Sequence, residues 1–318
     1  MRKSVNLQRV SFEETTLEGQ IKDFISKLKK LGYRVNENDP VAVQGYLLAN
    51  GWVAQKIPAL LLLGPAGTGK TFFAECFAKA LGYAFISYQC HYGSGKEELL
   101  YDLDVKGVVE KLSGSQGELA SYLRPGILPS AIQMANKLSK NGRGVVLLLD
   151  EVEKTRPEVD AFLLDFLQSG RIYDPHLGNF VLQDGARLLV VATSNQDRLL
   201  SEPLMRRFRR VYMKYPPVEV EMEIILRACP EAHPAFVKGL VSVAGWLRSR
   251  EDIMKPPATP ELINLVQDVL LLDDPALRAE VALSWLCAYE EDRAILEEKY
   301  PKSWWTGMLQ DKDIRKKS

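Results

Sequence analysis

The stretch that decides the fold runs Gly64-Pro65-Ala66-Gly67-Thr68-Gly69-Lys70-Thr71. It fits the pattern G-x-x-x-x-G-K-[ST] at every fixed position. An apolar run over 59–63 predicts a strand leading into it, and 71–81, ended by Gly82, predicts a helix leading out. Glycines let backbone N–H groups turn inward around phosphate oxygens, and the positive end of the following helix faces the same anion. Residues 64–71 are therefore predicted to hold the phosphates of a nucleotide.

Two side chains at the end of this loop have specific expected roles. Lys70 is expected to reach the β- and γ-phosphates, and the Thr71 hydroxyl is expected to coordinate Mg²⁺. The bound groups predicted from the sequence are therefore ATP and Mg²⁺.

A second apolar strand ends in two acidic residues. The run 145–149 is followed directly by Asp150 and Glu151, which places both carboxylates at the C-terminal edge of a sheet, where ligands bind in α/β folds. Asp150 is expected to hold the Mg²⁺ shell. Glu151 is expected to orient and polarise the attacking water, because phosphoryl transfer depends mainly on positioning and charge stabilisation. An Asp-Glu pair after a strand is also a common helix start, so its meaning depends on the phosphate-binding loop one crossover earlier.

Two further polar segments follow. Asn195 comes after the apolar run 188–193 and is predicted to donate to the γ-phosphate or to the water. The segment Arg206-Arg207-Phe208-Arg209-Arg210 is strongly basic. At this point of an ATPase sheet an arginine can reach the γ-phosphate bound by a neighbouring subunit. Arg207 is favoured for that role, with Arg206 as the second choice.

The segment between residues 41 and 217 alternates apolar strands with helices. Strands are expected over 59–63, 84–89, 145–149, 187–193 and 210–213. Because they are apolar along their whole length, they indicate a parallel sheet covered on both faces. The stretches at about 104–124 and 172–185 are expected to be insertions, and residues 1–40 a small N-terminal helical element.

Beyond the Pro216-Pro217 boundary the sequence predicts helices alone. They are expected over 220–228, 235–248, 260–272 and 275–300, so that 218–310 forms a helical lid domain. The charged end, 311–318, is expected to be frayed. The predicted fold class is α/β: a P-loop NTPase parallel sheet covered by helices on both faces, followed by an all-helical lid.

Composition narrows the classes of function. The 318 residues carry a formal net charge of zero, so no overall field draws the protein to nucleic acid or an anionic membrane. The longest apolar runs are too short to span a bilayer, and without a targeting segment the expected location is the cytoplasm. Four scattered cysteines and three histidines form neither a disulfide framework nor a zinc site, which favours reduced structural thiols.

With these residues assembled, the chain resembles the AAA+ ATPases and, within them, the MoxR-like group. The matching features are 64–71 as Walker A, Asp150-Glu151 as Walker B, Asn195 as sensor 1 and Arg206-Arg207-Phe208 as the arginine-finger segment. The stretches 125–131 and 154–170 also fit the group, and the two insertions resemble its helix-2 insert and pre-sensor-1 hairpin. The resemblance covers about residues 36–272.

One position departs from the family pattern. The start of a lid helix often carries a sensor 2 arginine, and the corresponding residue here is Pro260. Either the chain works without that arginine, or Arg248 or Arg250 takes its place, and sensor 2 is left unassigned.

The resemblance implies Mg-dependent ATP hydrolysis by an oligomer, a hexameric ring, that remodels a protein partner in a chaperone-like manner. Partners of MoxR-like proteins often carry a von Willebrand factor A domain. The alternative is a nucleic-acid motor or restriction-system component, because related clades drive such systems and the basic stretches 206–210 and 312–317 could contact phosphates. The zero net charge argues against that alternative. A scaffold that binds ATP but turns it over little is disfavoured by the intact Glu151.

Overall fold

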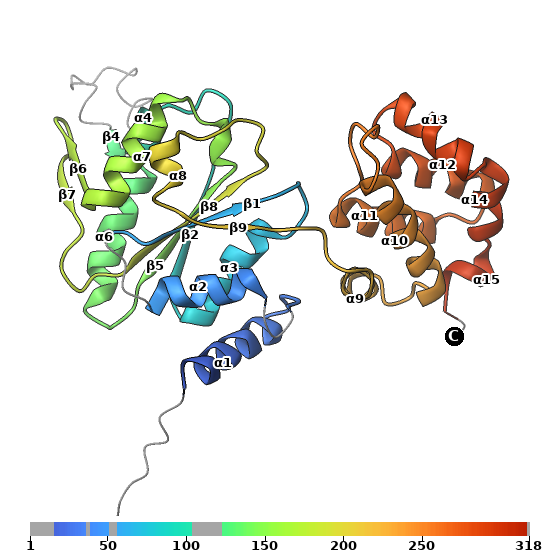
Figure 1. Ribbon diagram of the computed structural model, residues 1–318, viewed down its shortest axis with the longest axis horizontal. Coiled ribbons are helices and arrows are strands. Elements are labelled where there is room, and N and C mark those ends of the chain that lie inside the picture. Colours follow the sequence, from blue (N-terminus) through green and yellow to red (C-terminus); the bar gives the residue numbers. More distant parts are fainter. Residues whose placement is uncertain (1–15, 36–38, 51–55, 104–122, 317–318) are drawn as a thin grey trace, which may run out of the picture.

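A computed structural model of the chain describes residues 16–35, 39–50, 56–103 and 123–316 (Figure 1). The expected insertion at 104–124 therefore lies outside the described residues except for its last two. Among the described helices, none is long and apolar enough to cross a membrane.

The centre of the fold is a parallel sheet of five strands. They are β1 (Ala59–Leu63), β2 (Ala84–Gln89), β5 (Val145–Asp150), β8 (Leu188–Ser194) and β9 (Arg209–Tyr212), in the order β2-β5-β8-β1-β9. In this register Asp150 pairs with Gln89, and Leu63 pairs with Ser194. The strands that end in the predicted site residues are thus neighbours, and their carboxyl ends share one edge.

Both faces of the sheet are buried, as the continuous apolar runs predicted. Alternate residues of one strand enter different cores: Leu61 and Leu147 face one cluster, whereas Leu60 and Leu148 face the other. One face is covered by α1 (Leu17–Lys30), α2 (Pro40–Asn50) and α3 (Lys70–Leu81). The other is covered by α4 (Lys96–Leu100), α6 (Ile127–Ser139), α7 (Glu158–Ser169) and α8 (Glu202–Met205) (Figure 1). The predicted P-loop parallel sheet is confirmed.

Two short hairpins accompany the sheet. β3 (Tyr101–Leu103) pairs with β4 (Leu123–Pro125), and β6 (Arg171–Asp174) pairs with β7 (Gly178–Val181), both antiparallel. The second hairpin occupies the expected insertion at 172–185. A 3₁₀ turn, η2 (Val152–Lys154), directly follows Glu151.

The C-terminal part is helical, with its own apolar core. It contains α9 (Val218–Ala228), α10 (Pro234–Arg248), α11 (Thr259–Leu271), α12 (Pro275–Leu286), α13 (Glu290–Lys299), α14 (Lys302–Met308) and α15 (Asp311–Ile314) (Figure 1). The helix expected over 275–300 is in fact two helices, because Cys287 and Tyr289 are extended. This break brings buried Asp292 to the backbone N–H groups of Met254 and Lys255, at 2.8 and 3.1 Å.

The end of the chain also differs from the expected frayed tail. Ile314 is fully buried in the lid core, and its carbonyl accepts a hydrogen bond of 2.7 Å from the His233 amide. Arg315 forms a β-bridge with Ala232. Most residues of the segment are charged, but the apolar side chain of Ile314 anchors the segment in the lid core.

Candidate nucleotide-binding site

Three positions of the loop 64–71 have backbone conformations that glycine alone adopts without strain. Gly64, Gly67 and Gly69 have φ angles of 139°, 71° and 88°. A Cβ on Gly64 would lie 2.1 Å from the carbonyl oxygen of Met213, and a Cβ on Gly67 would lie 2.4 Å from the Cβ of Ala258. Any side chain at either position would collide with its surroundings, so the loop can present backbone amides at close range.

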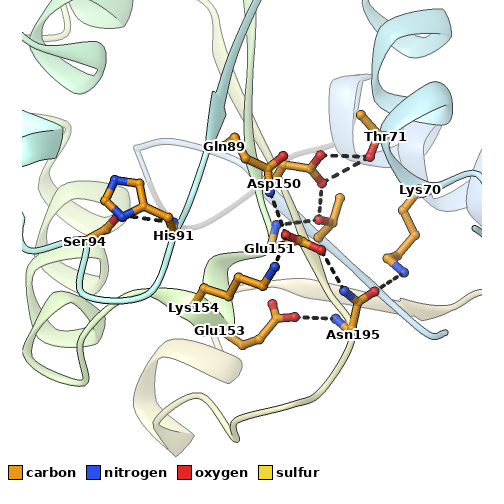
Figure 2. Close-up of polar contacts among 11 residues, drawn as sticks. Lys70, Thr71, Gln89, His91, Ser94, Asp150, Glu151, Glu153, Lys154 and Asn195 are labelled. Atoms are coloured by element: carbon orange, nitrogen blue, oxygen red, sulfur yellow. Dashed lines mark hydrogen bonds and ion pairs between the residues drawn. The ribbon is translucent and has the colours of Figure 1, made fainter. Parts of the chain in front are cut away.

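Lys70 lies inside the loop at the first turn of α3 and is 7% exposed. Its Nζ donates to the carbonyls of Gly64 and Pro65, both at 2.7 Å. It also donates to Oδ1 of Asn195 at 2.8 Å (Figure 2). Burial lowers the pKa of Lys70, and the nearby carboxylate of Glu153 opposes that shift. The ammonium is therefore held between the loop and the end of β8. A bound phosphate would replace these oxygen atoms as the acceptor of its hydrogen bonds.

Thr71 and Asp150 provide oxygen atoms at a single point. The Thr71 hydroxyl donates to both carboxylate oxygens of Asp150, at 2.9 and 3.1 Å, and Thr193 donates to the same carboxylate. Mg²⁺ prefers oxygen ligands and usually takes one or two from protein side chains beside those of phosphates and water. The pair Thr71 and Asp150 fits this requirement.

Glu151 has an unusual backbone, with φ 55° and ψ 51°. A left-handed conformation at a residue other than glycine costs about 1–3 kcal/mol and occurs often at functional sites. The Thr193 hydroxyl accepts a hydrogen bond of 2.8 Å from the Glu151 amide. Oε1 accepts from Nδ2 of Asn195 at 3.0 Å, and Oε2 accepts from Nε2 of Gln89 at 2.7 Å and Nζ of Lys154 at 2.5 Å (Figure 2).

Asn195 connects the lysine of the loop to this acid. Its side chain accepts from Lys70 and donates to Glu151, so the three groups form a continuous hydrogen-bonded chain. The backbone N–H of Asn195 donates to Oε1 of Glu153 at 2.8 Å. Glu153 lies in the turn after β5 and is only 2% exposed. Its buried carboxylate therefore holds the backbone of the segment after β8 in place.

In the part of the chain that the structure describes, two cavities border the glycines of the loop. The first, of about 370 Å³, is lined by Lys70, Thr71, Asp150, Glu151 and Asn195 among others. The second, of about 520 Å³, lies between the loop, the segment 31–34 and the lid helices α9 and α11. It has the size and the mixed apolar and polar walls of a small-molecule pocket.

The predicted arginines lie outside the first of these cavities. Arg207 is exposed and donates to Gln168 at 3.4 Å, and Arg206 is exposed and pairs with Glu202. Neither residue lines the cavity around Lys70.

Pro260 occupies the place considered for a sensor 2 arginine. It lines both cavities, at the start of α11. Arg248 is buried in the lid against Glu221, and Arg250 is paired with Asp252. Neither arginine lines the cavities beside the loop. The arginines that line the larger one are Arg34 and Arg227.

Several residues of the site were absent from the sequence-based expectations. Gln89 and Lys154 contact Glu151, Thr193 contacts Asp150, and Glu153 contacts Asn195. For Gln89 the available signal was its position as the last residue of a strand beside the strand of Asp150. The segment 31–34, whose role the sequence did not reveal, forms a wall of the larger cavity.

Comparisons with known proteins agree with this geometry. Residues 59–208 match the family described as the AAA domain of the dynein-related subfamily. The chain is 33% identical over 144 residues to the chaperone protein ClpB of Mycoplasmoides gallisepticum, a match that covers 44% of this chain and 17% of that protein. It is 27% identical over 233 residues to ClpB 2 of Parasynechococcus marenigrum, covering 72% of this chain and 22% of that protein. The matched regions span about a fifth of the length of these relatives.

Among solved structures, the RuvB Holliday junction branch migration motor of Thermotoga maritima is similar. The TM-score is 0.43 at 18% identity, with 83% of this chain and 69% of that chain covered. The five-stranded parallel sheet is the predicted P-loop sheet, and residues 59–208 match the AAA domain family. The matched domain and the Clp-like relatives together support an AAA+ ATPase.

Proposed function

We propose that the protein is a Mg-dependent ATPase of the MoxR-like group that works as an oligomer on a protein partner. The observation that carries the proposal is the hydrogen-bonded chain from Lys70 through Asn195 to Glu151, beside the oxygen pair of Thr71 and Asp150. Phosphate binding, metal binding and water activation each have a residue of suitable chemistry within this one cluster.

Each side chain has a distinct part in the proposed reaction. The amides of 64–71 and the Lys70 ammonium bind and orient the triphosphate, and the larger cavity receives the adenosine. Thr71 and Asp150 would hold Mg²⁺, which would supply charge neutralisation at the phosphates. Glu151 accepts a hydrogen bond from the attacking water, and Asn195 orients that water or the γ-phosphate.

The oligomer enters the proposal through Arg207. Its exposed position between α8 and β9 would allow it to reach nucleotide bound by an adjoining subunit, as an arginine finger does. We propose a hexameric ring in the cytoplasm. The protein partner is proposed from the Clp-like relatives and from the MoxR resemblance, which extends to partners with a von Willebrand factor A domain.

Comparison of Glu151→Gln with wild type tests the catalytic assignment. The amide keeps the shape of the side chain but cannot accept a proton, so we expect ATP binding to persist while turnover falls about 10²–10⁴-fold. Turnover equal to that of the wild type would reject Glu151 as the base. The same variant, held in its ATP-bound form, is the bait for isolating the protein partner.

Mixed oligomers test the arginine assignment. Arg207→Ala alone should lose about 10³–10⁵ in turnover. When Arg207→Ala is mixed with Glu151→Gln, a site can combine Glu151 from one subunit with Arg207 from the next, and a fraction of the activity should return. Recovery with Arg206→Ala in place of Arg207→Ala would assign the role to Arg206, and no recovery with either would reject an arginine finger from this segment.

A further inference from the structure

The two cavities beside the loop 64–71 share part of their walls. Gly67, Gly69, Phe72 and Pro260 line both of them. The smaller cavity contains Lys70 and the other residues proposed to act on the phosphates. A nucleotide bound there by its phosphates therefore extends into the larger cavity with its nucleoside.

The lid contributes mainly apolar side chains to the larger cavity. Val220, Ile224, Arg227 and Ala228 line it from α9, and Ile263 lines it from α11. On an α-helix, residues separated by three or four positions share one face, so one face of α9 forms this wall. Among the described residues that the lid places in the cavity, Arg227 alone carries a charge.

The guanidinium of Arg227 lies against the backbone of Gly32. A Cβ at position 32 would lie 2.7 Å from Nη1 of Arg227 and 3.4 Å from both Cζ and Nη2. Gly32 itself has a φ angle of 91° and lines the same cavity. Arg227 thus reaches from α9 to the wall formed by 31–34, and the missing side chain of Gly32 leaves room for its guanidinium.

The hydrogen-bonding groups of Arg227 are not used by the described parts of the chain. Arg34, the other arginine that lines this cavity, pairs with Glu223, with 3.4 Å between Nε and Oε2. Arg227 has no such carboxylate and no hydrogen bond to another described residue. A guanidinium offers five N–H donors and a planar surface that stacks on aromatic rings. Both remain available to a ligand in the cavity.

We infer that Arg227 is the residue through which the lid binds the nucleobase, with its guanidinium against the ring of the base. The inference rests on the proposed nucleotide-binding function. Pro260, the described lid residue that lines the smaller cavity, has neither a charge nor an N–H donor. The lid therefore responds to the nucleoside and not to the γ-phosphate.

The position of Arg227 determines which ligands it affects. ATP and ADP carry the same nucleoside, so loss of the guanidinium should weaken the binding of both by the same factor. We expect a loss of about three- to thirtyfold, which corresponds to roughly 0.7–2 kcal/mol, as for a cation on an aromatic ring partly shielded from water. At saturating Mg-ATP, kcat should stay within about twofold of the wild type, because the contact with the base is the same before and during the reaction.

The test is a calorimetric titration of Mg-ATP and Mg-ADP into the full chain carrying Arg227→Met or Arg227→Lys, each in the Glu151→Gln background that slows turnover. Arg250→Met is the matched control, because Arg250 is a lid arginine that pairs with Asp252 and lines neither cavity. Thermal unfolding without nucleotide establishes that each variant is folded. We expect equal losses for both nucleotides in Arg227→Met, a smaller equal loss in Arg227→Lys, which keeps the charge, and unchanged affinities in Arg250→Met.

Mg-tripolyphosphate, which has no nucleoside, separates a contact with the base from a contact with the phosphates. Its affinity, measured by competition with Mg-ATP, should be the same with and without Arg227→Met. A folded Arg227→Met protein that binds both nucleotides as tightly as its parent would overturn the inference. A larger loss for Mg-ATP than for Mg-ADP, or a loss for tripolyphosphate, would place Arg227 at the phosphates and would overturn it as well. If the protein with intact Arg227 binds no Mg-ATP, the proposed function itself is rejected.

Discussion

The buried ion pair between Glu221 and Arg248 allows a sharp prediction about the lid. Arg248 donates to the two carboxylate oxygens of Glu221 at 2.7 and 2.9 Å, and the Thr259 hydroxyl donates to the same carboxylate at 2.6 Å. The side chains of Glu221 and Arg248 are 1% and 8% exposed. Glu221→Ala would leave the guanidinium buried and without its carboxylate.

The expected cost follows from that burial. Removing one partner of a buried ion pair costs about 3–5 kcal/mol, because the remaining charge stays desolvated. The bond from Nε of Arg248 to the carbonyl of Pro257, at 2.8 Å, and its stacking 4.0 Å from the Tyr215 ring hold the guanidinium in place, so it cannot easily turn to water. We therefore expect Glu221→Ala to lower the free energy of unfolding of the lid by about 3–5 kcal/mol.

Urea unfolding followed by tryptophan fluorescence measures this change. Four of the five tryptophans lie in the lid, at 246, 285, 304 and 305, so the signal reports on the lid. The double variant Glu221→Leu/Arg248→Met removes both charges and should recover about 2 kcal/mol or more relative to Glu221→Ala. A loss below about 1 kcal/mol in Glu221→Ala, or a double variant no more stable than the single one, would refute the reasoning.

Three further predictions concern the loop and its contacts. Gly64→Ala should destabilise the protein by roughly 3 kcal/mol, because the new Cβ would meet the Met213 carbonyl at a φ of 139°, and a thermal melt no lower than that of the wild type would contradict this. Asn195→Ala should lower kcat about 10²–10³-fold, the effect of removing one preorganised donor, and steady-state kinetics with an unchanged kcat would exclude its proposed role. Cys90 should resist alkylation at neutral pH until the protein unfolds, because burial raises the pKa of its thiol to about 12, and rapid labelling of the native protein would count against its placement.

The parts of the fold that the sequence predicted well are those with a strong local signal. The run Ala59–Leu63 is apolar at every position and the glycine-rich loop follows it without a gap, so the strand, the loop and the helix α3 follow from the residues themselves. The same holds for β5, where five apolar residues precede Asp150. A parallel sheet follows because such strands must be covered on both faces.

Contacts between distant segments could not be predicted in this way. Gln89 is an ordinary polar residue in the sequence, and only the pairing of β2 with β5 brings it to Glu151. Arg248 was considered for a role at the nucleotide, but the burial of Glu221 on another helix determines where its guanidinium lies. The contact of Asp292 with the 254–255 backbone, which the break between α12 and α13 makes possible, likewise joins segments that are distant in the sequence.

The most direct test of the account is a calorimetric titration of Mg-ATP into the full chain carrying Glu151→Gln, beside the same protein with Lys70→Ala. We predict a saturable heat with one site per chain. Without Lys70 we expect the affinity for Mg-ATP to be at least about tenfold weaker, because the Lys70 ammonium is the positive charge placed inside the loop. A tenfold change in affinity corresponds to about 1.4 kcal/mol. An absence of binding heat under varied conditions, or equal affinities for the two proteins, would contradict a phosphate site built on residues 64–71.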